Sequence, residues 1–124
     1  MSAARRLVVT VCSRERGVVV LPVERGERAT RLDAAGVLGA LQALVARRGL
    51  GDRVHVRDGC AGGCWGAGPN VDVRAYAAPA PGERPDHVAL GWKTYVYSLP
   101  TLASLADVID ESLPTARATR RAGR

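Results

Sequence analysis

Three cysteines carry the clearest chemical signal in this chain. Cys12 follows an apolar segment, and Cys60 and Cys64 are separated by three residues within a glycine-rich stretch. Thiolates bind soft metal ions and iron–sulfur clusters, and an odd number of cysteines cannot all form disulfides within one chain. In a protein expected in the reducing cytoplasm, closely spaced cysteines favour a metal or redox site over a disulfide framework.

The stretch that holds Cys60 and Cys64 is suited to an anionic group. Five of the twelve residues from 59 to 70 are glycine. Glycine permits positive φ angles, so such a loop can curl tightly and point several backbone N–H groups inward. A thiolate-bound iron–sulfur cluster is anionic, and hydrogen bonds to its sulfurs tune its potential. The alternative is a plain turn that holds two buried thiols.

Two expected strands bring the cysteines together. Leu7–Val11 is apolar on both faces, which is typical of an interior strand, and Arg53–Asp58 alternates as a half-buried strand does. The apolar spacing of Thr30–Arg48 predicts a helix between them, with Thr30 or Asp33 as its cap. Such a crossover makes the two strands parallel, so their carboxyl ends share one edge of the sheet. We therefore expect all three sulfurs to lie close together at that edge.

The rest of the chain predicts three further extended segments and a second helix. The run Val18–Val23 contains Pro22, which indicates an edge strand or an extended loop. Alternation of apolar and polar residues predicts a strand at Val71–Ala77, and aromatic and β-branched residues predict another at Trp92–Ser98. Thr101–Leu113 has a stripe of leucine and isoleucine typical of a helix, with Thr101 as its cap.

Length and charge fix the domain organisation. One domain is what 124 residues can form, and four arginines in the last eight residues contribute most of the net charge of +6. We expect one α/β domain over residues 1–113, with two main helices on a mixed central sheet. Residues 114–124 are expected to form a disordered basic tail.

Composition also argues against several classes of function. Aromatic residues make up 4% of the chain and phenylalanine is absent, which argues against nucleic-acid binding. The apolar runs are too short for a membrane helix or a signal peptide, so we expect a cytoplasmic protein without membrane contact. The chain has no nucleophile triad pattern, no paired carboxylate site and no nucleotide-binding fingerprint, and we do not expect an enzyme.

The cysteine pattern, taken with these elements, is similar to that of a known family. A strand ending at Cys12, a helix, a second strand, and then Gly59-Cys60, Gly62, Cys64 and Gly68-Pro69 resemble the thioredoxin-like 2Fe–2S ferredoxins over about residues 6–113. The resemblance implies a thioredoxin-like fold, a homodimer, and one-electron transfer to a redox partner protein. It also implies that Cys12, Cys60 and Cys64 are cluster ligands.

One cysteine of the family pattern is missing. It would fall near Leu21–Arg25, where no cysteine occurs, so four thiolates from one chain cannot bind a cluster here. Glu15, Glu24 or His55 could supply the fourth ligand. Alternatively, the three cysteines bind a single metal ion such as zinc or iron with an exogenous ligand, or the site is empty.

Three functions therefore remain open. The first is a ferredoxin-like electron-transfer or metal-binding protein that uses the three cysteines. The second is a cluster-free thioredoxin-fold interaction protein, and the apolar run Val18–Val23 predicts an exposed edge for a homodimer. The third is a thiol-disulfide protein that uses Cys60 and Cys64, although their spacing differs from the usual Cys-x2-Cys motif.

Overall fold

A four-stranded mixed sheet organises the chain. The computed structural model describes residues 5–59, 69–77, 82, 91–95 and 98–113. The sheet has the strand order β4-β1-β5-β6, and these strands are Val54–Asp58, Arg5–Val11, Val71–Ala77 and Gly91–Tyr95. β1 is parallel to β4 and antiparallel to β5, and β5 is antiparallel to β6. The expected mixed α/β architecture and the parallel pairing of the first strand with the strand after the helix are both confirmed.

The first helix begins later than the sequence predicts. α1 spans Ala34–Arg47, and its N-cap is Asp33, whose Oδ1 accepts a hydrogen bond of 2.7 Å from Gly36 N. Thr30–Asp33 forms strand β3 instead of the first helical turn, because its backbone pairs with β2, Val18–Leu21. The prediction of Thr30 as the cap was therefore wrong, and Asp33 was the correct choice.

β2 and β3 form a separate two-stranded sheet, which we call the β2–β3 ribbon. The ribbon is not part of the central sheet. Val19 and Leu21 are buried in the core, whereas Val18 and Val20 are 42% and 56% exposed. The extended segment predicted here is confirmed, and Pro22 follows its last residue.

The second helix is shorter than predicted. A 3-10 helix, η1, spans Leu99–Thr101, and α2 spans only Asp107–Asp110. The chain between them is not helical, because the N–H groups of Leu105 and Ala106 donate to the carbonyl oxygens of Pro22 and Val23. The Thr101 hydroxyl donates to Ser98 O within η1 and caps no helix. The prediction of a single helix over Thr101–Leu113 was wrong, although its apolar residues Leu105, Ile109 and Leu113 are buried.

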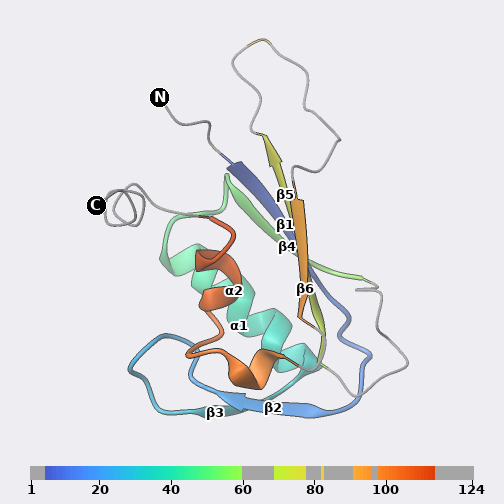
Figure 1. Ribbon diagram of the computed structural model, residues 1–124, viewed down its shortest axis with the longest axis vertical. Helices are drawn as coiled ribbons and strands as arrows, with labels where there is room; N and C mark the ends of the chain where they lie inside the picture. The colour runs from blue at the N-terminus through green and yellow to red at the C-terminus, as the bar shows by residue number, and fades with distance from the viewer. Residues whose placement is uncertain (1–4, 60–68, 78–81, 83–90, 96–97, 114–124) are drawn as a thin grey trace.

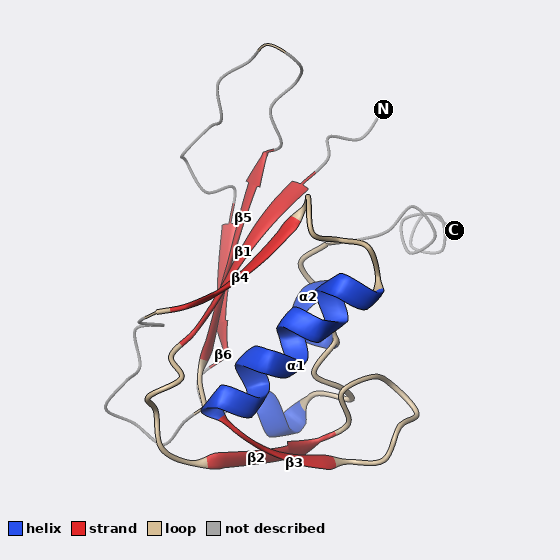
Figure 2. Ribbon diagram, turned by 180° about the vertical axis from the view of Figure 1, so that it is seen from behind, coloured by secondary structure: helices blue, strands red, loops and turns tan. Residues whose placement is uncertain are grey.

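The helices cover one face of the sheet. Figures 1 and 2 show α1 and α2 on the same side, with the β2–β3 ribbon at one end of this layer. We call the face beneath the helices the covered face; its buried side chains are those of Leu7, Val9, Val11, Val54, Val56, Val71, Val73, Ala75 and Tyr95. No described helix or strand packs on the opposite side.

Strand alternation places every second side chain of these strands on that opposite side, which we call the open face. The open face comprises Arg6, Val8, Thr10, His55, Arg57, Asp72, Arg74, Tyr76, Trp92 and Thr94. None of the helices in the described part of the chain has the length and hydrophobicity needed to cross a bilayer. Residues 96–97, at the end of the predicted strand Trp92–Ser98, and the predicted tail 114–124 lie outside the described residues.

Candidate functional site at the carboxyl ends of β1 and β4

The parallel pairing puts the ends of β1 and β4 side by side. Val11, the last residue of β1, is paired with Asp58, the last residue of β4. Beyond this pair, Gly59 N donates a hydrogen bond of 3.0 Å to Val11 O. Cys12 follows directly and is partly exposed. Cys60 and Cys64 lie outside the described residues, so the convergence of the three sulfurs stays a prediction.

A first clamp joins the loop after β1 to the end of β4. The Ser13 backbone N–H donates to Asp58 Oδ1 at 3.0 Å, and the Ser13 hydroxyl donates to Oδ2 at 2.7 Å. The side-chain and backbone hydrogen bonds from Ser13 hold the pKa of Asp58 below its ordinary value. The clamp therefore keeps a negative charge beside Cys12 and fixes the direction in which the chain leaves β1.

A second clamp joins the same loop to the start of β5. Glu15 N donates to Cys12 O at 3.2 Å, which closes a turn. The Glu15 side chain is only 8% exposed, and its two carboxylate oxygens accept hydrogen bonds of 3.0 and 2.9 Å from the backbone and side-chain nitrogens of Asn70. A metal ion at Glu15 would compete with these bonds, so the carboxylate acts as a connector in this fold.

The two clamps fasten both ends of the glycine-rich segment to one loop. Gly59 precedes residues 60–68 and is bonded to Val11, while Asn70 lies just beyond them and is bonded to Glu15. The segment that contains Cys60 and Cys64 thus begins and ends next to the turn that contains Cys12.

Arg57 brings a positive charge to this edge. A Cβ atom at Gly59 would lie 3.1 Å from Arg57 Nη2 and 3.4 Å from Thr10 Cγ2. The absence of a side chain at Gly59 therefore lets the guanidinium lie against the backbone there. A positive charge at this position favours an anionic occupant.

Two of the predicted ligand candidates lie away from Cys12. The Glu24 carboxylate accepts hydrogen bonds from Arg47 and Arg48 at 2.8 and 3.1 Å, which hold it at the C-terminus of α1. Bonds to Arg48 and Arg47 also lower its pKa. Glu24 is therefore engaged by two guanidinium groups at the end of α1 that leads into β4.

His55 is also separated from the cysteine. It is exposed on the open face and paired with Val8. Val8 precedes Cys12 by four residues, or about 13 Å along an extended strand. Within the described ranges, no group of three His, Cys, Asp or Glu side chains is arranged to hold a metal ion.

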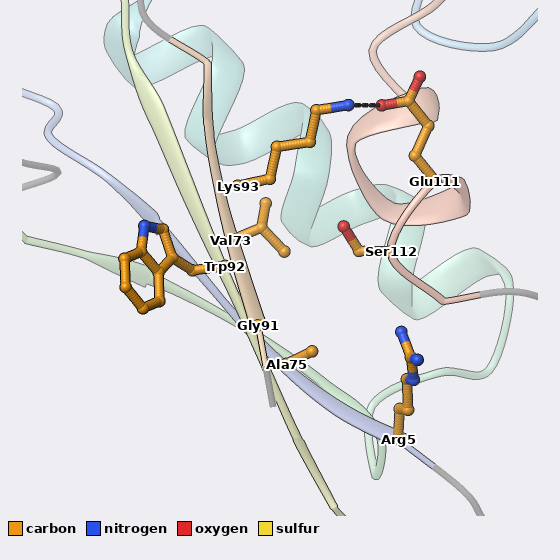
Figure 3. Close-up of a pocket in the computed structure, with 8 residues that line it drawn as sticks. All are labelled: Arg5, Val73, Ala75, Gly91, Trp92, Lys93, Glu111 and Ser112. Carbon is orange, nitrogen blue, oxygen red and sulfur yellow. Dashed lines mark hydrogen bonds and ion pairs between the residues drawn. The ribbon is translucent and has the colours of Figure 1, made fainter. Parts of the chain in front are cut away.

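A small pocket lies elsewhere, between the edge strand β6 and the end of α2. Its volume is about 180 Å³. Figure 3 shows Lys93 and Ser112 on the side of this pocket, with Trp92 directed to the other side of the strand. Glu111 accepts hydrogen bonds from Lys93 Nζ at 2.8 Å and from the Tyr95 hydroxyl at 2.6 Å.

These bonds pair the ionisable groups beside the pocket with one another, so none of Lys93, Tyr95 and Glu111 is poised to react. Burial and the bond to Glu111 raise the pKa of the Tyr95 phenol, while Lys93 and Tyr95 lower the pKa of the Glu111 carboxyl. The phenol therefore stays protonated and the carboxyl stays charged at neutral pH. None of the predicted site residues lines this pocket.

Sequence reasoning missed the residues that hold the site. Asp58 ends a predicted strand and Asn70 precedes one, positions at which polar groups often serve a sheet edge. Their partners Ser13 and Glu15 are 45 and 55 residues away in sequence, and no local pattern connects them. Comparisons of the chain with family models, curated proteins and solved structures find no match.

Proposed function

We propose that this chain is a small cytoplasmic electron-transfer or metal-binding protein that uses Cys12, Cys60 and Cys64. The observation that carries the proposal is the parallel pairing of β1 with β4, extended by the bond from Gly59 to Val11. It brings the chain positions next to Cys12 and Cys60 to one edge of the sheet. Ligand sites in α/β sheets gather at this edge.

A thioredoxin-like fold is part of the same proposal. Its support is the order of the elements: a parallel pair joined through α1, then the antiparallel strands β5 and β6, then α2 on the same face as α1. The β2–β3 ribbon is an addition within the connection from β1 to α1.

The surroundings of Cys12 can position a thiolate-bound group. Cys12 is partly exposed, as short-range transfer to a redox partner protein requires. Arg57 supplies a positive charge that offsets the Asp58 carboxylate, and the Ser13–Asp58 and Glu15–Asn70 clamps position the loop. A bound 2Fe–2S cluster would supply one-electron transfer. Because Glu24 and His55 lie away from Cys12 and Glu15 is engaged, the proposal includes an exogenous fourth ligand.

Anaerobic purification followed by metal and sulfide analysis tests the proposal. We expect visible absorbance and equal amounts of iron and acid-labile sulfide, and Cys12→Ala, Cys60→Ala and Cys64→Ala should each abolish both. His55→Ala is the matched control and should retain them. Stoichiometric zinc without sulfide would assign a single-ion site instead. Protein without any metal, unchanged by all three substitutions, would contradict the proposal.

The same variants separate electron transfer from dithiol chemistry. A thiol-disulfide protein needs only Cys60 and Cys64, so its disulfide would still form in Cys12→Ala. Mass spectrometry of oxidised Cys12→Ala detects this disulfide, and a variant that forms it and keeps its redox activity supports dithiol chemistry. Loss of both metal and redox activity in Cys12→Ala supports the three-cysteine site.

We also propose a homodimer formed through β2. The support is the pair of exposed valines, Val18 and Val20, on the outer side of the ribbon. A run of apolar residues on an exposed strand favours pairing with a second copy. Light scattering should give a dimer for the parent chain and a monomer for Val20→Lys, and a monomeric parent at micromolar concentration would overturn the idea.

A further inference from the structure

The open face of the sheet concentrates arginines and aromatic rings. Across neighbouring strands, Val8 is paired with Arg74, and Arg74 is paired with Trp92. Arg6 is paired with Tyr76, and its guanidinium lies 4.8 Å from the centre of the tyrosine ring. Figure 3 shows Trp92 directed away from Lys93, Val73 and the helices.

The charge on this face is positive. Its carboxylate, Asp72, is buried and accepts hydrogen bonds from Arg74 Nε at 3.3 Å and from the Thr94 hydroxyl at 3.1 Å. Asp72 is therefore satisfied within the face and offsets one arginine. Among the described residues, Arg6 and Arg57 form no ion pair with a carboxylate.

The aromatic side chains are placed for stacking. Trp92 is 73% exposed, the most exposed of the large hydrophobic residues in the described part of the chain. Trp92 and Tyr76 lie diagonally across β6 and β5, a relation that separates side chains by about 7–8 Å. An exposed indole beside Arg74 contributes little to a core but presents a π-face to a planar partner.

We propose that the open face binds single-stranded nucleic acid. A base stacks on Trp92, backbone phosphates contact Arg6, Arg57 and Arg74, and Tyr76 holds the Arg6 guanidinium against its ring. Single strands are bound in this way by basic surfaces with interspersed aromatic rings, because every base has a π-face. The small aromatic fraction of the whole chain argues against such binding, but strand register brings two of the rings onto one basic surface.

An acidic protein surface fits this face less well. Carboxylates would pair with the arginines but would leave Trp92 without a planar partner. The exposed part of the face, around Arg74 and Trp92, suits unstacked bases, which recognition of single strands requires. RNA and DNA share this chemistry and differ here only in the 2′-hydroxyl.

Fluorescence anisotropy with labelled oligodeoxyuridylate and oligouridylate tests the proposal on the full chain. Trp92→Ala should weaken binding about tenfold, because the indole would no longer stack on a base. Trp92→Phe should recover most of that loss. Arg74→Gln should reduce the slope of log affinity against log salt by about 0.7, the value expected for one lost phosphate contact on a single strand.

Arg31→Gln is the matched charge control. Arg31 is exposed on β3, outside the open face, and the basic C-terminal residues are the same in every variant. Its salt slope should equal that of the parent chain. Equal effects of Arg31→Gln and Arg74→Gln would assign the binding to net charge and overturn the proposal.

Competition with polyglutamate and with duplex nucleic acid distinguishes single-stranded nucleic acid from the other possible ligands of the open face. If polyglutamate displaces the oligonucleotide and Trp92→Ala has no effect, the face binds acidic proteins and the proposal fails. A duplex that binds as tightly as the single strand contradicts base stacking. Tighter binding of either oligouridylate or oligodeoxyuridylate identifies the preferred sugar, because these two strands differ only in the 2′-hydroxyl.

Discussion

The two faces of the central sheet are made from the same four strands and have opposite compositions. Val8 and Val9 are adjacent in β1, yet Val9 is fully buried beneath the helices and Val8 is partly exposed. The covered face is almost entirely aliphatic, whereas the open face carries arginine, threonine and aromatic residues. Strand alternation thus separates the residues that stabilise the fold from those available for binding.

The two faces should differ most in how much the free energy of unfolding falls when a valine on each face is replaced by alanine. Val9→Ala should lower the free energy of unfolding by about 2 kcal/mol, because two buried methyl groups are lost and a cavity remains. Val8→Ala is the matched control and should cost about 0.5 kcal/mol. Chemical denaturation of both variants measures the difference, and equal losses would mean that the open face is also packed.

A smaller effect is expected where the two faces meet, at the cysteine edge. In Glu15→Gln, an NH2 group would face one of the Asn70 nitrogens that now donate to the carboxylate. This mismatch should cost about 1.5 kcal/mol. Glu27→Gln, at an exposed carboxylate, is the control. A Glu15→Gln variant as stable as the control would contradict the connecting role of Glu15.

Acid sensitivity should arise on the helical side. Burial alone would raise the pKa of Asp107, but hydrogen bonds from Arg25 and Ser104 outweigh it and leave the pKa below its ordinary value of 3.8. The charged form therefore stabilises the fold fully above about pH 4, and this contribution is lost as the pH falls through the lower folded pKa.

Asp107→Asn removes that charge. It should cost about 1 kcal/mol at neutral pH and make the decline of stability below pH 4 shallower. Urea denaturation from neutral to acidic pH measures both effects. An unchanged acid profile would mean that Asp107 has the same pKa in the folded and unfolded chains.

The smallest effect is expected on the open face. Trp92→Ala should change the free energy of unfolding by less than about 0.5 kcal/mol, because the indole is largely exposed already. Thermal denaturation tests this directly. A loss similar to that of Val9→Ala would show that Trp92 packs against the fold and would weaken its assignment to binding.

Local patterns in the sequence predicted the strands of the central sheet better than they predicted the β2–β3 ribbon and the second helix. Leu7–Val11 and Arg53–Asp58 were assigned correctly, because apolar runs and strict alternation are strong signals. Thr30–Asp33 has neither signal, and it forms a strand only because β2 lies opposite. The second helix is broken by bonds from Leu105 and Ala106 to Pro22 and Val23, more than eighty residues away in sequence.

In the candidate site too, the sequence predicted some features and could not have predicted others. Cys12 was predicted to follow the first strand, and it does. The Ser13–Asp58 clamp could not have been predicted, because it depends on the register between β1 and β4. Glu15 was singled out as a possible ligand for its closeness in sequence to Cys12. Its buried contact with Asn70 becomes visible only once β5 is placed antiparallel to β1.

The two clamps at the cysteine edge also make the segment between them replaceable. Gly59 and Asn70 are held by β1 and its following turn, so the two positions that flank residues 60–68 are already fixed. Doubling the length of a flexible loop raises its closure cost by only about 0.6 kcal/mol. The glycine-rich segment can therefore diverge, lengthen or be exchanged for another sequence while the sheet persists, and the scaffold can acquire a new ligand by grafting at this one position.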